Sequence, residues 1–176
     1  LPCLLHSGQC TMGFNDATHC DVQALSFHPN GNHFIAAAAD GIARVYDLRA
    51  NRAAVFKTKQ SFEARSIDDR QNHVVQQHAI LATTFSADAR FLYTCHAWED
   101  SGISPWCVWD AYTGDFIRSV EGHSDWITAI DSIQTLPPCL NGPNRPAGSL
   151  DYCITTSRDH DITLWEMEGQ SYWMRK

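Results

Sequence analysis

The stretch from residue 21 to residue 47 reads DVQALSFHPNGNHFIAAAADGIARVYD and alternates short apolar runs with turn signals. Pro29-Asn30-Gly31 supplies the fixed φ and the positive φ that a tight reversal needs, and Asp40-Gly41 predicts a second turn. Together with the run that follows, this stretch predicts four strands, over Asp21–Phe27, Phe34–Ala38, Ala43–Asp47 and Ala53–Lys57. We expect the first of them to be buried. The stretch therefore predicts an antiparallel, all-β unit.

The same pattern occurs three times along the chain. In each unit an aromatic–acid pair closes a run of alternating apolar residues and lies downstream of a histidine; the pairs are Tyr46-Asp47, Trp109-Asp110 and Trp165-Glu166, and the histidines are His19, His78 and His123. Self-similarity at a spacing of roughly 40 residues is typical of repeat proteins, whose units bury their faces against one another. We expect one domain over residues 1–176, with units at approximately 19–57, 78–120 and 123–176 and insertions at 58–77, 96–106 and 131–150.

These motifs resemble those of the WD-repeat family, whose unit of about 40–45 residues has a Gly-His near its start and a Trp-Asp near its end. Gly122-His123 and Trp109-Asp110 are the best examples here. The resemblance implies a β-propeller of about three four-stranded blades. The stretch Phe27–Phe34, with Tyr46–Ala50, is similar to the fifth blade of heterotrimeric G-protein β subunits. The chain therefore resembles the C-terminal three blades of a seven-bladed ring, and its start at Leu1 suggests a trimmed or incomplete chain.

The resemblance also implies a hydrogen-bonded tetrad of histidine, serine or threonine, aspartate and tryptophan inside each blade. A buried aspartate must be paired, and an imidazole that it orients can pass a hydrogen bond onward. The third unit has a full set, formed by His123, Ser157, Asp159 and Trp165. The first unit has His19, Asp40 and Tyr46, with Ala38 in the hydroxyl position. The second unit has His78 and Trp109, and an insertion displaces its aspartate. Because the first set is incomplete, we expect Asp40→Ala to destabilise less than Asp159→Ala.

A catalytic interpretation of His123, Asp159 and Ser157 is the alternative. A nucleophile needs an exposed position beside an oxyanion hole, and the chain has no Gly-x-Ser-x-Gly turn. We therefore predict a structural role and no enzyme activity. The remaining histidines lack metal-binding spacing, and no glycine-rich phosphate loop is present. The sequence predicts no metal, no cofactor and no small-molecule substrate.

Candidate partner-binding residues follow from the resemblance to G-protein β subunits, which hold the α subunit on one face of loops. Asp21 and Gln23 match positions at or near that contact, whereas Ala39 and Arg158 depart from the family, which has an acid and a tryptophan there. Two insertions, 58–77 and 96–106, belong to the same face. Aromatic residues and arginine are enriched at binding hot spots. The candidates are Asp21, Gln23, Trp98, Trp106 and Arg158.

The bulk composition narrows the class of partner. With 13 Lys and Arg against 20 Asp and Glu, the formal charge is −7, which argues against nucleic acids and anionic membranes. No apolar run approaches the roughly 20 residues that span a bilayer. Seven cysteines without a Cys-x-x-Cys motif favour reduced thiols and an intracellular location. We predict a scaffold for protein–protein interactions, with G-protein α-like or γ-like subunits or other complex members as partners; the alternative is an architectural subunit of a large stable assembly.

Overall fold

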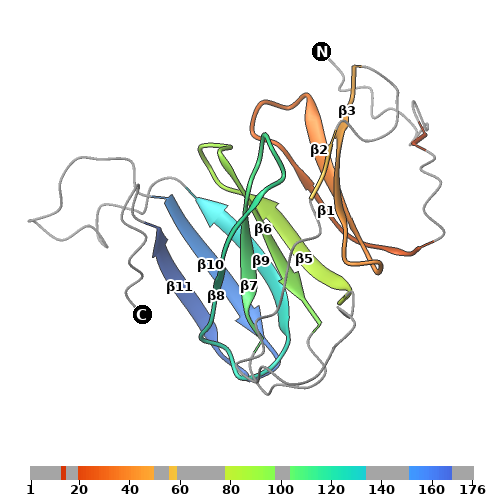
Figure 1. Cartoon of the computed structure of the whole chain (residues 1–176). Helices are drawn as coiled ribbons and strands as arrows, with labels where there is room; N and C mark the ends of the chain where they lie inside the picture. Colours follow the sequence, from red (N-terminus) through yellow and green to blue (C-terminus); the bar gives the residue numbers. More distant parts are fainter. Residues whose placement is uncertain are drawn as a thin grey trace, which may run out of the picture.

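The computed structural model describes residues 13–14, 20–49, 56–58, 78–97, 104–133 and 151–167. These residues form eleven β-strands and contain no helix, which confirms the predicted all-β class. The strands make three antiparallel sheets, and the green sheet lies between the orange one and the blue one (Figure 1). No helix in the described ranges is long and apolar enough to cross a membrane.

Sheet 1 is a four-stranded meander in which each strand pairs with the next one in the chain. It contains β1 (Val22–Phe27), β2 (His33–Ala38), β3 (Ala43–Asp47) and β4 (Phe56–Lys57). Gly31 and Gly41 have φ values of 70° and 74°, as the two predicted turns require. The strand expected over Ala53–Lys57 is described only at Phe56–Lys57.

Sheet 2 repeats this meander, and sheet 3 shows three of its strands. Sheet 2 contains β5 (Ile80–Phe85), β6 (Phe91–His96), β7 (Trp106–Asp110) and β8 (Phe116–Val120). Sheet 3 contains β9 (Ile127–Ile133), β10 (Asp151–Ser157) and β11 (Ile162–Met167). Strand β9 runs three residues into the insertion expected over 131–150, because Ser132 and Ile133 still pair with Cys153 and Tyr152. A further strand expected near Tyr172 and Trp173 lies outside the described residues.

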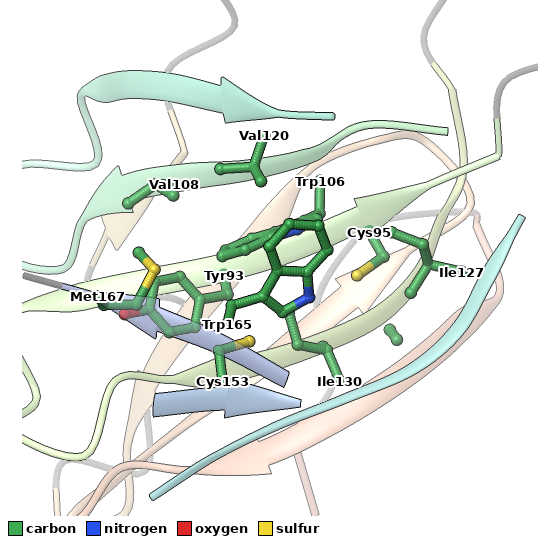
Figure 2. Close-up of a cluster of buried hydrophobic side chains, with 11 residues drawn as sticks. Tyr93, Cys95, Trp106, Val108, Val120, Ile127, Ile130, Cys153, Trp165 and Met167 are labelled. Carbon is green, nitrogen blue, oxygen red and sulfur yellow. The ribbon is translucent and has the colours of Figure 1, made fainter. Parts of the chain in front are cut away.

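The core consists of two apolar clusters, one in each space between neighbouring sheets. The cluster between sheets 1 and 2 contains Ile35, Ala37, Ala43, Val45, Ile80, Phe85, Leu92, Cys107, Trp109 and Ala111. The cluster between sheets 2 and 3 contains Ala82, Tyr93, Cys95, Trp106, Val108, Val120, Ile127, Ile130, Cys153, Trp165 and Met167, most of them labelled in Figure 2. Sheet 2 is thus buried on both faces, as an inner unit of a repeat protein must be.

The prediction that the first strand is buried is wrong. Strand β1 packs only its Ala24 side against the cluster between sheets 1 and 2. Val22, Leu25 and Phe27 are 54%, 64% and 71% exposed. The reason is that strand patterning shows which residues are apolar but does not show whether a neighbouring sheet covers them.

Candidate functional site

Sheet 3 holds a buried chain of three hydrogen bonds, which we call the sheet 3 relay. His123, in the connection before β9, donates from Nδ1 to the Asp159 carboxylate at 2.9 Å. Its Nε2 lies 2.7 Å from Oγ1 of Thr155, and that oxygen accepts the Trp165 indole N–H at 2.8 Å. An imidazole held by a carboxylate at Nδ1 accepts at Nε2, so the Thr155 hydroxyl donates to it. Through these side chains the relay joins the connection before β9 to β10, to β11 and to the turn between them.

Thr155 supplies the hydroxyl of this relay, and the expectation that Ser157 does so is wrong. Ser157 Oγ donates instead to the carbonyl of Asp125 at 2.8 Å and accepts the Asp159 N–H at 3.2 Å. Both residues lie on β10 two positions apart, so they point to the same face of the sheet. Only the strand register decides between them: Cys153 pairs with Trp165, which places Thr155 beside the indole nitrogen.

Asp159 sits at the centre of the turn between β10 and β11. It accepts from His123 and from the backbone N–H groups of Ser124, at 2.9 Å, and Asp161, at 2.9 Å. Burial alone would raise the pKa of this carboxyl, but these hydrogen bonds favour the ionised form and hold the pKa well below its usual range. The carboxylate therefore stays charged and ties the start of β9 to the turn after β10.

The glycine before His123 is explained by a close approach. A Cβ placed on Gly122 would lie 2.5 Å from Cη2 of Trp165. That indole cannot move away freely, because it packs edge-on against Trp106, with ring centroids 6.0 Å apart, and donates to Thr155. The position of the tryptophan therefore explains the glycine of the Gly-His pair.

Sheet 2 builds an equivalent chain of hydrogen bonds, the sheet 2 relay, from different residues. The Trp109 indole N–H donates to Thr94 Oγ1 at 2.8 Å, and Thr94 lies 2.9 Å from Nε2 of His96. Nδ1 of His96 donates to the backbone carbonyl of His78 at 3.3 Å. His78 thus contributes its carbonyl to the relay, while the ring expected from it comes from His96. Neither Thr94 nor His96 was a sequence candidate, although the Thr-x-His spacing before a tryptophan strand is visible in the sequence.

His96 is held as a neutral imidazole. It is buried, and desolvation lowers its pKa from 6.5 to about 4, an effect that the hydrogen bond to His78 only partly offsets. The carbonyl fixes the proton on Nδ1, so Nε2 accepts from the Thr94 hydroxyl. The relay runs in the same direction as in sheet 3, with a carbonyl in place of the carboxylate.

Sheet 1 keeps the aspartate but changes its partner. Asp40 forms an ion pair with Arg44 of β3, whose Nη1 donates to Oδ1 at 3.1 Å. The strand register puts Ala36, not Ala38 as predicted, at the position of Thr155 and pairs it with Arg44. Tyr46 stacks on Phe34 with ring centroids 5.0 Å apart. His19, the fourth member expected here, lies outside the described residues.

These buried groups are poorly placed for chemistry on a substrate. Thr155 and Thr94 are 0% exposed and His123 is 2% exposed, so no hydroxyl of either relay reaches solvent. Burial also raises the pKa of the thiols of Cys107 and Cys153, which removes them as nucleophiles. Within the described ranges, no three side chains of His, Cys, Asp or Glu gather as metal ligands would. The arrangement is suited to holding strands together.

A second region, at one edge of the sheets, has exposed polar side chains. The same backbone hydrogen bond marks this edge in each sheet: Ala39 to Asp21 at 2.9 Å, Ala97 to Ala79 at 2.9 Å and Arg158 to Trp126 at 3.0 Å. We call it the entry edge; its described residues are 20–21, 39–42, 78–79, 97, 121–126 and 158–161. It lies where β1, β5 and β9 begin and where β2, β6 and β10 end.

Three of the predicted partner-binding residues are exposed at or next to the entry edge. Asp21 directly precedes β1, and Gln23 is the extra residue of a β-bulge between Val22 and Ala24. Arg158 lies on sheet 3, and its guanidinium carbon sits 4.6 Å above the ring of Trp126. Asp21 and Arg158 therefore share an edge but belong to sheets at opposite ends of the array. Trp126 was not among the sequence candidates, although an aromatic residue just before a strand was visible.

Trp106 is not a surface residue, and its expected role in partner binding is wrong. It is 1% exposed and is the first residue of β7. Its ring packs edge-on against Tyr93, at 5.2 Å between centroids, and against Trp165 in the cluster of Figure 2. The side chain points into the space between sheets 2 and 3 because β7 begins earlier than the loop boundary suggested. Trp98 lies outside the described residues, as does most of the three insertions.

Comparison with known families agrees with this architecture. A family model described as WD domain, G-beta repeat, matches residues 8–47. The match ends at Asp47, the last residue of β3. The chain is similar to the guanine nucleotide-binding protein subunit beta of Saccharomyces cerevisiae, with 24% identity over 133 residues that cover 64% of this chain and 30% of that protein. It is also similar to the subunit beta-5b of Danio rerio, with 28% identity over 109 residues that cover 61% of this chain and 22% of that protein.

Solved structures show the same fold. A structure entitled "Crystal structure of RRP9 WD40 repeats" matches with a TM-score of 0.58 and 16% identity, covering 90% of this chain and 39% of that one. A structure entitled "Structure of U3-55K" matches with a TM-score of 0.58 and 15% identity over the same shares. The chain therefore has the fold of part of a WD-repeat propeller and resembles G-protein β subunits in sequence. It spans less than a third of the length of the two curated relatives, at 30% and 22%.

Proposed function

We propose that this chain is a non-catalytic WD-repeat scaffold that binds other proteins through its entry edge. The observation that carries the proposal is the division of polar groups between two places. The imidazoles and hydroxyls of the two relays are buried and hydrogen-bonded. The Arg158 side chain, in contrast, is exposed and its guanidinium lies over the ring of Trp126. Strand residues of a propeller are committed to packing, so loops supply the specificity of binding.

The chemistry of the entry edge indicates the kind of protein surface that it fits. Asp21, Glu121, Asp125 and Asp161 are exposed carboxylates there, and the whole chain has a formal charge of −7. A partner surface rich in lysine and arginine would be attracted to this edge and held less tightly at high ionic strength. Arginine and tryptophan, the types of Arg158 and Trp126, are among the residues enriched at binding hot spots.

The finer proposal is a role in signal transduction resembling that of the G-protein β subunits. Similarity to the two β subunits supports it, and so does the exposure of Asp21 and Gln23, which by the family resemblance fall at or near α-subunit contact positions. We also propose an intracellular location, because all four described cysteines, at positions 20, 95, 107 and 153, are free thiols.

An architectural role in a large stable assembly is the second candidate. The exposed apolar side chains of β1, β10 and β11 favour it, since large permanent interfaces are more apolar than reversible ones. The two roles differ in their response to salt. A reversible complex at the acidic entry edge weakens as ionic strength rises, whereas an apolar permanent interface does not.

The test is affinity capture with quantitative mass spectrometry, using the full chain, Arg158→Ala and Trp126→Ala. Tyr112→Ala is the matched control, because Tyr112 is 72% exposed in the turn between β7 and β8, at the opposite edge of sheet 2. We expect the two entry-edge variants to lose the same set of proteins, at least several-fold, and the control to retain it. Loss with Tyr112→Ala and retention with Arg158→Ala would place binding on the other edge.

A further inference from the structure

The turn between β1 and β2 contains an Asn-Gly pair in an open setting. Asn30 and Gly31 are both exposed, and a Cβ placed on Gly31 would meet no atom beyond its chain neighbours within 4 Å. Oδ1 of Asn30 accepts the N–H of Asn32 at 2.9 Å, which folds the side chain back along its own backbone. The side-chain amide carbon of Asn30 therefore lies near the Gly31 nitrogen, and glycine offers such an approach the least steric hindrance.

His33 faces the nitrogen of the same side-chain amide. Its Nδ1 lies 3.2 Å from Nδ2 of Asn30. Because the amide atom that accepts the Asn32 N–H must be the oxygen, the other one is an N–H donor, and Nδ1 of His33 accepts from it. The second ring nitrogen of His33, Nε2, lies 3.7 Å from the Asp47 carboxylate, which favours a proton on that side of the ring. A group that can carry a proton thus lies against the atom that leaves when an amide is lost.

We propose that Asn30 is a site of spontaneous deamidation in the folded chain, and that His33 assists the reaction by donating a proton. The Gly31 nitrogen loses its proton to water and bonds to the amide carbon of Asn30, whose carbonyl electrons move onto Oδ1. The Asn32 N–H, already bonded to Oδ1, stabilises the negative charge there. When these electrons return, the bond to Nδ2 breaks, His33 protonated from solvent supplies a proton, and ammonia leaves a succinimide ring. Water then opens the ring to aspartate or isoaspartate.

One hydrogen bond of the turn limits the rate of this reaction. The Gly31 N–H donates to the carbonyl of His28 at 2.9 Å, so the nitrogen can attack only after that bond opens. Exposed turns open locally without unfolding of the sheet that carries them. The conversion is therefore gradual, and the modified form accumulates with the age of the protein.

The equivalent turn of sheet 2 shows that the aspartate product fits the fold. The strand registers and the turn hydrogen bonds align Asn30 with Asp88. Oδ1 of Asp88 accepts the N–H of Arg90 at 3.1 Å, just as Oδ1 of Asn30 accepts that of Asn32. Aspartate at position 30 therefore keeps the turn closed and adds one negative charge to a chain of formal charge −7. Isoaspartate lengthens the backbone by one carbon and opens the turn.

The experiment is peptide mapping by mass spectrometry during incubation of the folded full chain and of three variants. The conversion at Asn30 is measured from the mass gain of an amide that becomes an acid, and from the separation of aspartyl and isoaspartyl peptides. We expect His33→Gln and Gly31→Ala each to slow it several-fold. Asp47→Asn keeps His33 but removes the carboxylate beside its ring, and it should slow the conversion by a smaller factor. The Gly31→Ala turn can fold, because Ala89 at the equivalent position has a φ of 63°, against 70° for Gly31.

Two controls separate the contact with His33 from general effects. A second pair in the sequence, Asn141-Gly142, lies outside the described residues and is unchanged in every variant, so its rate should stay constant. In urea the folded contact is lost, and His33→Gln should then no longer change the rate at Asn30. Unfolding midpoints measured on the same samples show that each variant is folded during the incubation.

Three results would overturn the proposal. The first is no conversion at Asn30 in the folded chain over a time in which the unfolded chain converts. The second is an equal rate at Asn30 in the folded unaltered chain and in both His33→Gln and Asp47→Asn, which would remove the role of His33. The third is a His33→Gln effect of the same size at Asn141, because it would not arise from the contact. The turn lies at the opposite end of β1 from the entry edge, so none of these results depends on partner capture there.

Discussion

Sheets 2 and 3 contain the same chain of indole, hydroxyl and imidazole but fix the imidazole differently. In sheet 3, His123 donates to the carboxylate of Asp159, whereas in sheet 2, His96 donates to the backbone carbonyl of His78. A carboxylate can stabilise an imidazolium, and a neutral carbonyl does so far less. The difference teaches that the repeat requires an oriented imidazole and does not require a charge beside it.

Sheets 1 and 3 teach the complementary lesson about the aspartate. Asp40 accepts the N–H of Ile42 at 3.1 Å, and Asp159 accepts the N–H of Asp161 at 2.9 Å, so both close the turn after the second strand. The second carboxylate oxygen then binds Arg44 in sheet 1 and His123 in sheet 3. Turn closure is the constant role of this aspartate, and its side-chain partner varies.

The largest expected effect is the pH dependence of stability that His96 produces. The pKa of His96 lies near 4 in the folded chain, against 6.5 for an unperturbed histidine. Between these values the unfolded chain binds a proton that the folded chain does not, so stability falls as the pH is lowered through this window. The loss is about 3 kcal/mol at most, and this group adds no further loss below pH 4. Urea unfolding at a series of pH values measures it.

The control for the pH series is His96→Gln, which removes the titrating group from sheet 2. Its free energy of unfolding should fall less than that of the unaltered chain between pH 6.5 and pH 4. If the two chains show the same slope, His96 is not held neutral by burial, and the comparison of the two relays fails.

The next effect reverses the ranking expected from the sequence for the two aspartates. Asp40→Ala leaves the guanidinium of Arg44, which is 4% exposed, without its carboxylate. Removing one member of a buried pair costs about 3–5 kcal/mol, and we expect roughly 2–3 kcal/mol because Asp40 is partly exposed. Asp159→Ala leaves His123 and two N–H groups unpaired, for about 1–3 kcal/mol. Asp40→Ala should therefore destabilise at least as much.

Chemical unfolding of both variants measures this ranking, with Glu121→Ala as an exposed carboxylate control. Glu121 is exposed at the entry edge, so its removal should leave the unfolding midpoint unchanged. A clearly smaller loss for Asp40→Ala than for Asp159→Ala would restore the ranking expected from the sequence and show that Arg44 does not depend on its partner.

The smallest effect distinguishes the two candidate hydroxyls of sheet 3. Thr155→Val removes the oxygen that accepts from Trp165 at 2.8 Å and bonds His123, while it preserves the shape of the side chain. Ser157→Ala removes a hydroxyl bonded only at the strand end. We expect Thr155→Val to cost about 1 kcal/mol more than Ser157→Ala, as a buried unpaired donor does. Equal thermal midpoints for the two variants would contradict the assignment.

The sequence predicted the parts of this structure that depend on local chemistry. Turn residues and period-two patterning located the strands, and the Gly-His and Trp-Asp motifs located His123, Trp109 and Trp165. Spacing alone could not choose among Thr155, Thr156 and Ser157, three successive hydroxyl residues, because that choice depends on the register between strands.

The errors at Trp106 and β1 arise because packing partners are not local in sequence, and those at Arg44 and His96 have other causes. The pairing of Arg44 with Asp40 was not expected, because strand patterning does not predict a buried arginine. Arg44 is buried because the turn before β3 supplies the Asp40 carboxylate as its partner. His96 was overlooked because it ends a strand, where the motif places no histidine. Trp106 and β1 were misassigned in opposite directions, one buried by a neighbouring sheet and the other without such a neighbour.

The most direct test of the central claim, that each relay is a structural chain built around an oriented imidazole, is a nitrogen NMR measurement of His96 and His123 at neutral pH. We predict that both rings carry the proton on Nδ1 and have an unprotonated Nε2 that accepts from threonine. His96 should keep this state as the pH is lowered toward 4. A proton on Nε2 of either ring at neutral pH, or a His96 ring that titrates near 6.5, would contradict the account.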